Sequence, residues 1–138
     1  MFNNGELSGI LLTIARPEIT SYQSNTSKTG WNIRVRIMFR ASYDFLLALE
    51  RKFKTLDIDC NLRTVEGPNR KAPVLIVGKR AALNSVRELM NKDLPCSHAD
   101  WRLFDAVSEE ISEKNHLEEE GMNRIREMMN DENYFNEI

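Results

Sequence analysis

The chain of 138 residues is poor in cysteine, histidine and proline, and it has no apolar run long enough to cross a bilayer. Its two cysteines, Cys60 and Cys96, have neither the spacing of metal ligands nor the density of a disulfide-stapled domain, which indicates ordinary reduced thiols. The amino terminus lacks the basic region of a secretion signal. We therefore expect a single cytoplasmic domain over residues 1–138 with no membrane role.

The sequence also lacks the motifs of the common enzyme classes. It contains no recognisable nucleophile triad, phosphate-binding glycine loop or zinc pattern. His98 and His116 have no ligand partners at a recognisable spacing, and an isolated histidine is more often structural. The residues alone therefore point to no catalytic group, no metal site and no cofactor.

The net charge of −2 conceals two oppositely charged halves. Residues 16–80 carry 13 Lys and Arg against 6 Asp and Glu, a net charge of +7, whereas residues 81–138 carry 6 against 14, a net charge of −8. A basic segment of this kind attracts the phosphate backbone of nucleic acid. Antiparallel sheets also often have one solvated polar face, so charge alone leaves both interpretations open.

Strand patterns are concentrated in the basic half. Residues 31–40 alternate between an apolar face of Ile33, Val35, Ile37 and Phe39 and an opposite face of Asn32, Arg34, Arg36, Met38 and Arg40. The segment EITSYQ forms the partner strand through the polar loop 24–30. A second hairpin is predicted from DCNLRTV and APVLIVG around the turn residues 66–69. Two hairpins make one four-stranded antiparallel sheet.

Helical spacing follows each hairpin. Ser42 is the expected cap of a helix bearing Leu46, Leu49, Phe53 and Leu56. Three further apolar stripes consist of Leu83, Val86 and Met90; of Trp101, Phe104, Val107 and Ile111, with Ser97 as cap; and of Leu117, Gly121, Ile125 and Met129. The order αββαββ followed by helices predicts an α+β fold, with helices on one face of the sheet and the other face free.

The first helix raises a question of its own, because the almost entirely apolar segment LSGILLTIA, residues 7–15, contains Gly9. Glycine in a helix costs roughly 0.5–1 kcal/mol relative to alanine. Close approach of another backbone is one reason to keep it. Accommodation of a large side chain from the chain's own sheet is another.

Three segments of the chain resemble the LAGLIDADG homing endonucleases. LSGILLTIA is similar to the signature helix, and FLLALERKFKTLDIDCNLRTV is similar to the helix and third strand of that family. NHLEEEGMNRIREMM resembles the closing HLTxEG motif, carried here by His116, Leu117, Glu120 and Gly121. The resemblance covers nearly the whole chain. It implies a homing-endonuclease-like αββαββα fold with a saddle-shaped antiparallel sheet, double-stranded DNA as the partner, and an origin in a mobile element or virus.

The resemblance also implies a homodimer. In that family two signature helices pack against each other closely, which requires small residues where their backbones meet. Because this chain has a single signature helix, the second helix must come from a second copy. We expect the dimer interface to be formed by Leu7, Gly9, Ile10 and Thr13.

The sequence departs from the family at the catalytic position. The metal-binding acid of the family occupies the eighth place of the signature, which is Ile14 here, and the often acidic sixth place is Leu12. An aliphatic side chain cannot bind magnesium. A basic residue of the family's site falls near Ser97 and His98 in this chain. Glu18 is the one nearby carboxylate that could hold magnesium instead.

These observations together predict a catalytically inactive DNA-binding protein that acts as a regulator. Asn32, Arg34 and Arg36 are the expected groove contacts, because asparagine reads adenine and arginine reads guanine through paired hydrogen bonds. The expected phosphate contacts, or neighbours on the same face, are Lys28, Arg40, Arg63, Arg70 and Lys71. Two alternatives stay open: a metal-dependent DNA endonuclease that uses Glu18, and an RNA-binding or protein-binding module on the same scaffold.

Overall fold

The computed structural model describes residues 2–93 and 99–130. These residues form two compact units, the first comprising residues 2–17 and 36–93 and the second comprising residues 18–35 and 99–130. No helix in the described ranges is long and apolar enough to cross a membrane. That the whole chain functions as one domain stays a prediction.

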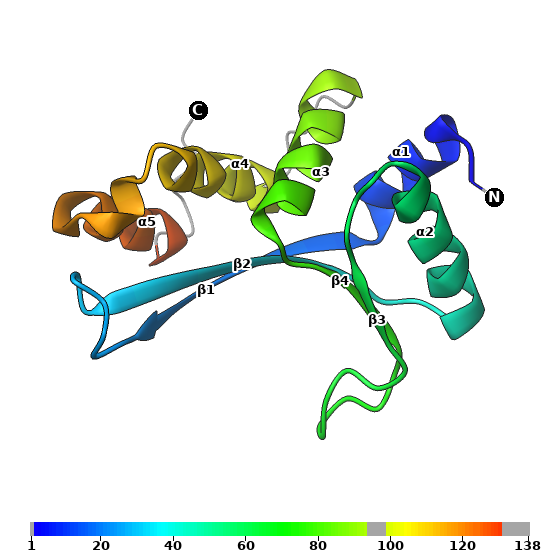
Figure 1. Ribbon diagram of the computed structural model, residues 1–138, viewed down its shortest axis with the longest axis horizontal. Coiled ribbons are helices and arrows are strands. Elements are labelled where there is room, and N and C mark those ends of the chain that lie inside the picture. The colour runs from blue at the N-terminus through cyan, green and yellow to red at the C-terminus, as the bar shows by residue number, and fades with distance from the viewer. Residues whose placement is uncertain (1, 94–98, 131–138) are drawn as a thin grey trace. The chain divides into compact units, whose positions relative to one another are not determined.

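Four strands form one sheet in the order β1-β2-β4-β3 (Figure 1). The strands are β1 (Ala15–Gln23), β2 (Trp31–Phe39), β3 (Asn61–Arg63) and β4 (Val74–Val77). The helices are α1 (Asn4–Thr13), α2 (Tyr43–Thr55), α3 (Arg80–Asp93), α4 (Ala99–Ser112) and α5 (Glu119–Asn130), with a short 3-10 turn, η1 (Asn115–Leu117), before α5. The α+β fold with an antiparallel four-stranded sheet, predicted from the sequence, is confirmed.

The core of the first unit lies between α2 and one face of β2 and β4. Ile37 is paired with Val77 and Phe39 with Leu75, and directly opposed residues of antiparallel strands project to the same face. All four are fully buried. The ring of Phe39 meets that of Phe53 from α2 edge to face, with the ring centroids 5.5 Å apart. The inward positions of Ile37 and Phe39 are therefore those that the strand alternation predicted.

Helix α2 begins where the sequence predicted. The hydroxyl of Ser42 accepts a hydrogen bond from the Phe45 N–H at 3.4 Å, and Leu46, Leu49 and Phe53 are fully buried. Leu56 departs from the predicted stripe. It is 37% exposed because the helix ends at Thr55, so Leu56 lies past the last helical turn.

Helix α1 belongs to the first unit and is closed at its start by a reciprocal cap. The Asn3 side chain accepts from the Glu6 N–H, and the Glu6 side chain accepts from the Asn3 N–H. The nearly buried Lys52 of α2 donates to the side-chain oxygen of Asn4 at 3.1 Å, which ties α2 to α1. The helix ends at Thr13, and Ala15 already begins β1.

The second hairpin has shorter strands and a longer loop than the sequence suggested. Strands β3 and β4 leave residues 64–73 as a loop that extends away from the helices of the first unit (Figure 1). The turn lies one residue beyond the predicted residues 66–69. The Gly67 N–H donates to the Arg70 carbonyl, and the Arg70 N–H donates back to the Gly67 carbonyl.

The second unit packs α4, η1 and α5 together. Trp101, Phe104 and Val107 of α4 are buried, as predicted. In the last stripe Ile125 is buried, but Leu117 is 52% exposed because it lies in η1, and Met122 and Met128 fill the core instead. Ser97, the predicted cap of α4, lies outside the described residues.

Candidate nucleic-acid interface

The first unit has an open sheet face opposite α2. In the register of the strands, Met38 is paired with Ile76, and Ile76 is also paired with Asn61. Arg63 is paired with Val74 on the same face, and Arg36 precedes Met38 by two residues on β2. Asn61 and Arg63 are exposed. We call this surface, formed by Arg36, Met38, Asn61, Arg63, Val74 and Ile76, the open face.

The middle of the open face is apolar. Met38, Val74 and Ile76 form a buried cluster that is only 2%, 0% and 8% exposed. The strand alternation placed Met38 correctly on the face of Arg36, but the expectation that this whole face is polar and cationic is wrong. The reason is cross-strand packing, because two apolar β4 side chains lie beside Met38 and remove it from water. The face therefore has an apolar floor with arginines and an asparagine around it.

Two of the predicted phosphate contacts of the first unit already have a carboxylate partner. The guanidinium of Arg40 donates to both oxygens of Glu66, with its Nε 2.8 Å from Oε1 and its Nη2 3.0 Å from Oε2. Arg70 lies 3.6 Å from the same carboxylate. The hydrogen bond from Arg40, followed by the charges of Arg40 and Arg70, lowers the pKa of Glu66 below its ordinary value. Glu66 is therefore the internal counter-charge of both arginines.

Lys71 contrasts with its neighbour Arg70. It is exposed, and no carboxylate in residues 2–93 or 99–130 lies within ion-pair distance of it. The same holds for Arg36 and Arg63 within the described ranges. These three cations are thus the members of the predicted set in the first unit whose charge is not met by an internal ion pair.

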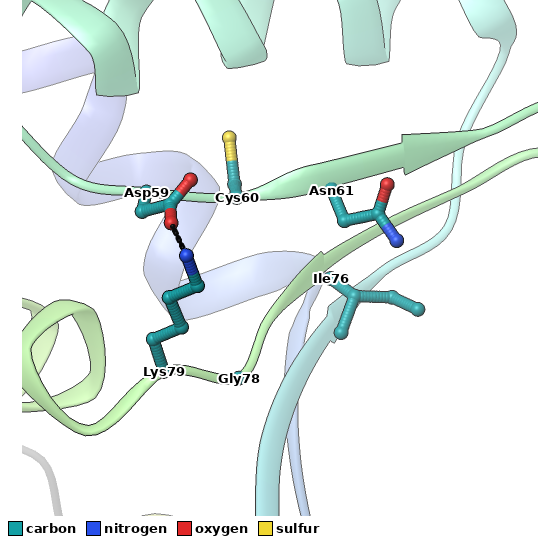
Figure 2. Close-up of a pocket in the computed structure, with 6 residues that line it drawn as sticks. All are labelled: Asp59, Cys60, Asn61, Ile76, Gly78 and Lys79. Carbon is teal, nitrogen blue, oxygen red and sulfur yellow. Dashed lines mark ion pairs between the residues drawn. The ribbon is translucent and has the colours of Figure 1, made fainter.

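A pocket opens at the end of the hairpin near β3, with a volume of about 400 Å³. Its lining residues are Asp59, Cys60, Asn61, Ile76, Gly78 and Lys79 (Figure 2). The ammonium of Lys79 lies 2.6 Å from the Asp59 carboxylate, and this pairing lowers the pKa of Asp59 and raises that of Lys79. Cys60 points toward α2 (Figure 2), and burial, with the nearby charges of Glu50 and Asp59, raises the pKa of its thiol to about 11. The thiol is therefore protonated at neutral pH and a poor nucleophile.

The second unit presents its cations differently. The Lys28 ammonium lies 2.9 Å from a carboxylate oxygen of Glu118, a pair that is 73% and 66% exposed and that joins residues from the basic and acidic halves of the sequence. An exposed pair of this kind contributes little stability and is easily exchanged. Arg126 of α5 lies 3.5 Å above the ring centroid of Trp31.

Residues 31–35 of β2 belong to the second unit. Because Arg126 of α5 packs on Trp31, the side of β2 that carries Trp31 faces α5. Because side chains alternate along a strand, Asn32 and Arg34 project to the side opposite Trp31. Arg34 is exposed, and neither side chain has a hydrogen-bond partner in the described part of the chain. Their predicted role as groove contacts stays a prediction.

Helix α1 leaves one side open. A Cβ atom built on Gly9 meets nothing within 4 Å, and the hydroxyl of Thr13 donates to the Gly9 carbonyl at 2.7 Å. Leu7 and Ile10, by contrast, are 3% and 8% exposed in the core of their own unit. These two were expected at a dimer interface, and in the single chain they are buried, so that interface stays a prediction. The exposed residues of this side are Gly9, Thr13 and the 50% exposed Leu12.

The residue at the eighth signature place does not fit a metal ion. Ile14 is the residue that caps the carboxyl end of α1, and its side chain offers no oxygen or nitrogen ligand. Glu18, the alternative carboxylate, lies four residues further along in β1. Among the residues that the structure describes, no three His, Cys, Asp or Glu side chains gather closely enough to hold a metal ion. Ser97 and His98 lie outside those residues.

The sequence patterns did not identify Asn61 and Ile76 as members of the open face, or Glu66 as the partner of Arg40. A signal for Asn61 was present, because Asn61 and Arg63 are two residues apart in a predicted strand and must share a face. The role of Glu66 had no local signal, since its partner Arg40 is 26 residues away in the sequence.

No family model and no curated protein matches the sequence. Solved structures do match the fold. The homing endonuclease I-TnaI superposes with a TM-score of 0.78 at 20% identity, over 92% of this chain and 85% of that one. The I-LtrWI LAGLIDADG homing endonuclease bound to target DNA gives 0.76 at 22% identity over 91% of this chain. The I-SmaMI LAGLIDADG homing endonuclease bound to cleaved DNA gives 0.78 at 18% identity over 93% of it.

The fold is therefore that of a LAGLIDADG homing endonuclease, as the resemblance of the sequence predicted. The chain spans 42% and 43% of the I-LtrWI and I-SmaMI chains, less than half of each. At identities of 14–22% the likeness concerns the fold alone.

Proposed function

We propose that this protein binds double-stranded DNA with the open face of its sheet and acts as a regulator without cleaving the DNA. The observation that carries the proposal is the open face itself, where Arg36, Asn61 and Arg63 surround an apolar floor. Neither arginine forms an ion pair, and the Asn61 side chain has no hydrogen-bond partner, among the residues that the structure describes. The fold likeness supports it, because I-LtrWI and I-SmaMI were solved bound to DNA. A two-stranded β-ribbon fits the major groove of B-DNA, which is about 12 Å wide.

We divide the proposed contacts into two kinds. Asn32, Arg34 and Arg36 remain the proposed groove contacts, while Arg63 and Lys71 are proposed phosphate contacts. Arg40 and Arg70 are held by Glu66, and Lys28 is held by Glu118. These three cations reach phosphate only by exchanging a carboxylate for it, so we expect them to contribute less to affinity than Lys71.

The absence of cleavage is proposed from Ile14. A magnesium-dependent nuclease needs oxygen ligands where the scissile phosphate is held, and the side chain at the signature's eighth place has none. The endonuclease alternative is favoured by one observation, that the structures of similar fold are described as homing endonucleases. Incubation of purified protein with a randomised plasmid pool and Mg²⁺ or Mn²⁺ separates the two. Site-specific cutting that disappears on Glu18→Gln would establish the nuclease.

We also propose that the protein functions as a homodimer through α1. The support is the open side of the helix, where a Cβ atom at Gly9 would meet no described residue within 4 Å and Leu12 is half exposed. The DNA-bound structures of similar fold are more than twice as long as the part that this chain matches. A second copy would supply an equivalent second unit of the same fold.

DNA binding is tested by fluorescence anisotropy of a labelled duplex across a salt series. A face that neutralises phosphates loses affinity with a slope of about 0.9 log units per phosphate, whereas a merely solvated face shows no such slope. Replacing Lys71 with Gln should flatten the slope for every sequence, and replacing Arg34 or Arg36 should mainly erase preference among sequences, by about 1–3 kcal/mol per base contact. Binding to single-stranded RNA with no binding to duplex DNA would favour the RNA module instead.

A further inference from the structure

We propose that Asn61 and Ile76 form a subsite that reads one A·T base pair, an inference that rests on the proposed DNA binding. The two residues are directly opposed on β3 and β4. Opposed residues of antiparallel strands have Cβ atoms about 4.5–5.5 Å apart and project to the same face. Figure 2 shows both side chains extending to one side of the hairpin, while Cys60 points toward α2.

The Asn61 amide is available to a ligand. The residue is exposed, and its side chain has no hydrogen-bond partner among the described residues. An asparagine amide carries one carbonyl acceptor and two N–H donors, which is the set needed to bind a group that offers one acceptor beside one donor. Beside it, Ile76 is 8% exposed and forms part of the apolar pocket lining.

Gly78 leaves room for a base edge to approach these two side chains. A Cβ atom at Gly78 would lie 3.9 Å from Ile76 Cγ2 and 4.0 Å from Arg36 Cγ. A larger side chain at this position would fill the space over Ile76 that belongs to the pocket. Asp59 is the only carboxylate among the lining residues, and the Lys79 ammonium pairs with it. This pairing neutralises the negative charge that would otherwise repel a DNA phosphate.

The pairing of an amide with an aliphatic side chain matches one base pair better than the others. In the major groove an A·T pair presents the adenine N7 acceptor and N6 donor together with the thymine methyl group, and asparagine binds the first two while an apolar side chain contacts the third. A G·C pair presents two acceptors on guanine and the cytosine N4 amine, which an isoleucine methyl would leave without a hydrogen bond.

The test uses chemically altered DNA, so that the wild-type protein reports on the subsite without any substitution. A duplex is first selected by the protein from a randomised library. Each thymine is then replaced by uracil, which lacks the methyl group, and each adenine by 7-deazaadenine, which lacks N7. We expect one A·T pair at which uracil weakens binding about fourfold, the value of one buried carbon, and 7-deazaadenine about fivefold, the value of one neutral hydrogen bond.

Substitution assigns the 7-deazaadenine effect to Asn61. Asn61→Ala should abolish the 7-deazaadenine effect at that pair and keep the uracil effect. The matched control is Asn84→Ala, an exposed asparagine of α3, which should keep both. The inference is overturned if the selected duplex binds in a salt-dependent manner yet no pair shows both effects, or if Asn61→Ala leaves both in place. Failure to bind any duplex would instead overturn the proposed function.

Discussion

Gly9 in α1 of the first unit and Gly121 in α5 of the second unit have completely different surroundings. A Cβ atom at Gly121, in the first turn of α5, would lie 2.0 Å from the carbonyl oxygen of Asn115, a distance that real atoms do not adopt. A Cβ atom at Gly9 of α1 would meet nothing within 4 Å. Gly121 is therefore required by the packing of its own unit. No contact within the described residues requires Gly9, and the proposed contact with a second copy would supply a reason for it.

The units also differ in how they treat their cations. In the first, Glu66 holds two arginines at the edge of the open face, while Arg36 and Arg63 form no ion pair with any described carboxylate. In the second, Arg124 donates to both oxygens of Glu110, and Asn115 donates to the same carboxylate. The first cluster lies on the surface proposed to bind DNA, whereas the second joins α4, η1 and α5. Similar carboxylate and arginine chemistry is thus used once beside a binding surface and once inside a packed unit.

The largest expected effect is that of Gly121→Ala. Because its Cβ atom would collide with the Asn115 backbone, we expect a loss of about 3 kcal/mol in the free energy of unfolding, at the upper end of overpacking costs. The measurement is urea denaturation. Gly9→Ala is the matched control, and it should stabilise the isolated chain by roughly 0.5–1 kcal/mol because alanine favours the helix and nothing blocks it. Equal changes in the free energy of unfolding at the two positions would show that crowding by Asn115 does not distinguish Gly121 from Gly9.

The next prediction tests the partner of Gly9. Gly9→Leu should leave the folded chain intact, since the side chain points into open space, but should weaken the dimer by about 1–3 kcal/mol through overpacking of the helix contact. Light scattering over a concentration series measures the mass in solution. A monomeric wild-type protein, or a leucine variant that dimerises as tightly as wild type, would show that α1 is not the interface.

Glu66→Gln should release Arg40 and Arg70 toward DNA. Each additional phosphate that these arginines neutralise should steepen the salt dependence of duplex binding by about 0.9 log units. Glu88→Gln, the same charge change on the exposed side of α3, is the control and should leave the slope unchanged. Anisotropy titrations supply both slopes. A flatter slope for Glu66→Gln would mean that Glu66 positions the arginines for binding and does not compete with the DNA.

The smallest expected effect concerns acid stability of the second unit. The hydrogen bond from Arg124 is the main reason that the pKa of Glu110 lies below its ordinary value of 4.5. A carboxylate whose pKa is lowered by folding contributes stability above its unfolded pKa and loses it as pH falls through the folded value. Stability should therefore decline below about pH 4.5. Glu110→Gln should remove part of that decline, by less than about 1 kcal/mol because Arg124 is partly exposed. Circular dichroism melts of both proteins between pH 3 and 7 measure this decline. A decline of equal size in wild type and Glu110→Gln would contradict the prediction.

Several features of this protein were determined by short-range patterns in the sequence. The alternation along β2 placed Ile37 and Phe39 in the core, and the Ser42 hydroxyl marked the start of α2. The turn predicted at residues 66–69 lies at residues 67–70 in the structure. Each depends on neighbours within a few positions, where backbone geometry fixes which side chains share a face or close a turn. The resemblance of three ordered segments to one family added the fold, which the structural comparison confirmed.

Only the tertiary structure decided which of the predicted side chains remain available for function. Met38, Leu7 and Ile10 are buried in the structure, because the burial of an apolar side chain depends on which side chains of other elements pack against it. The tertiary structure also joined Lys28 to Glu118 and Arg40 to Glu66, pairs separated by 90 and 26 residues. Charge counts and periodicity do not indicate which distant residues form such pairs, since strand register and helix packing decide which side chains meet. The same register placed Asn61 beside Ile76.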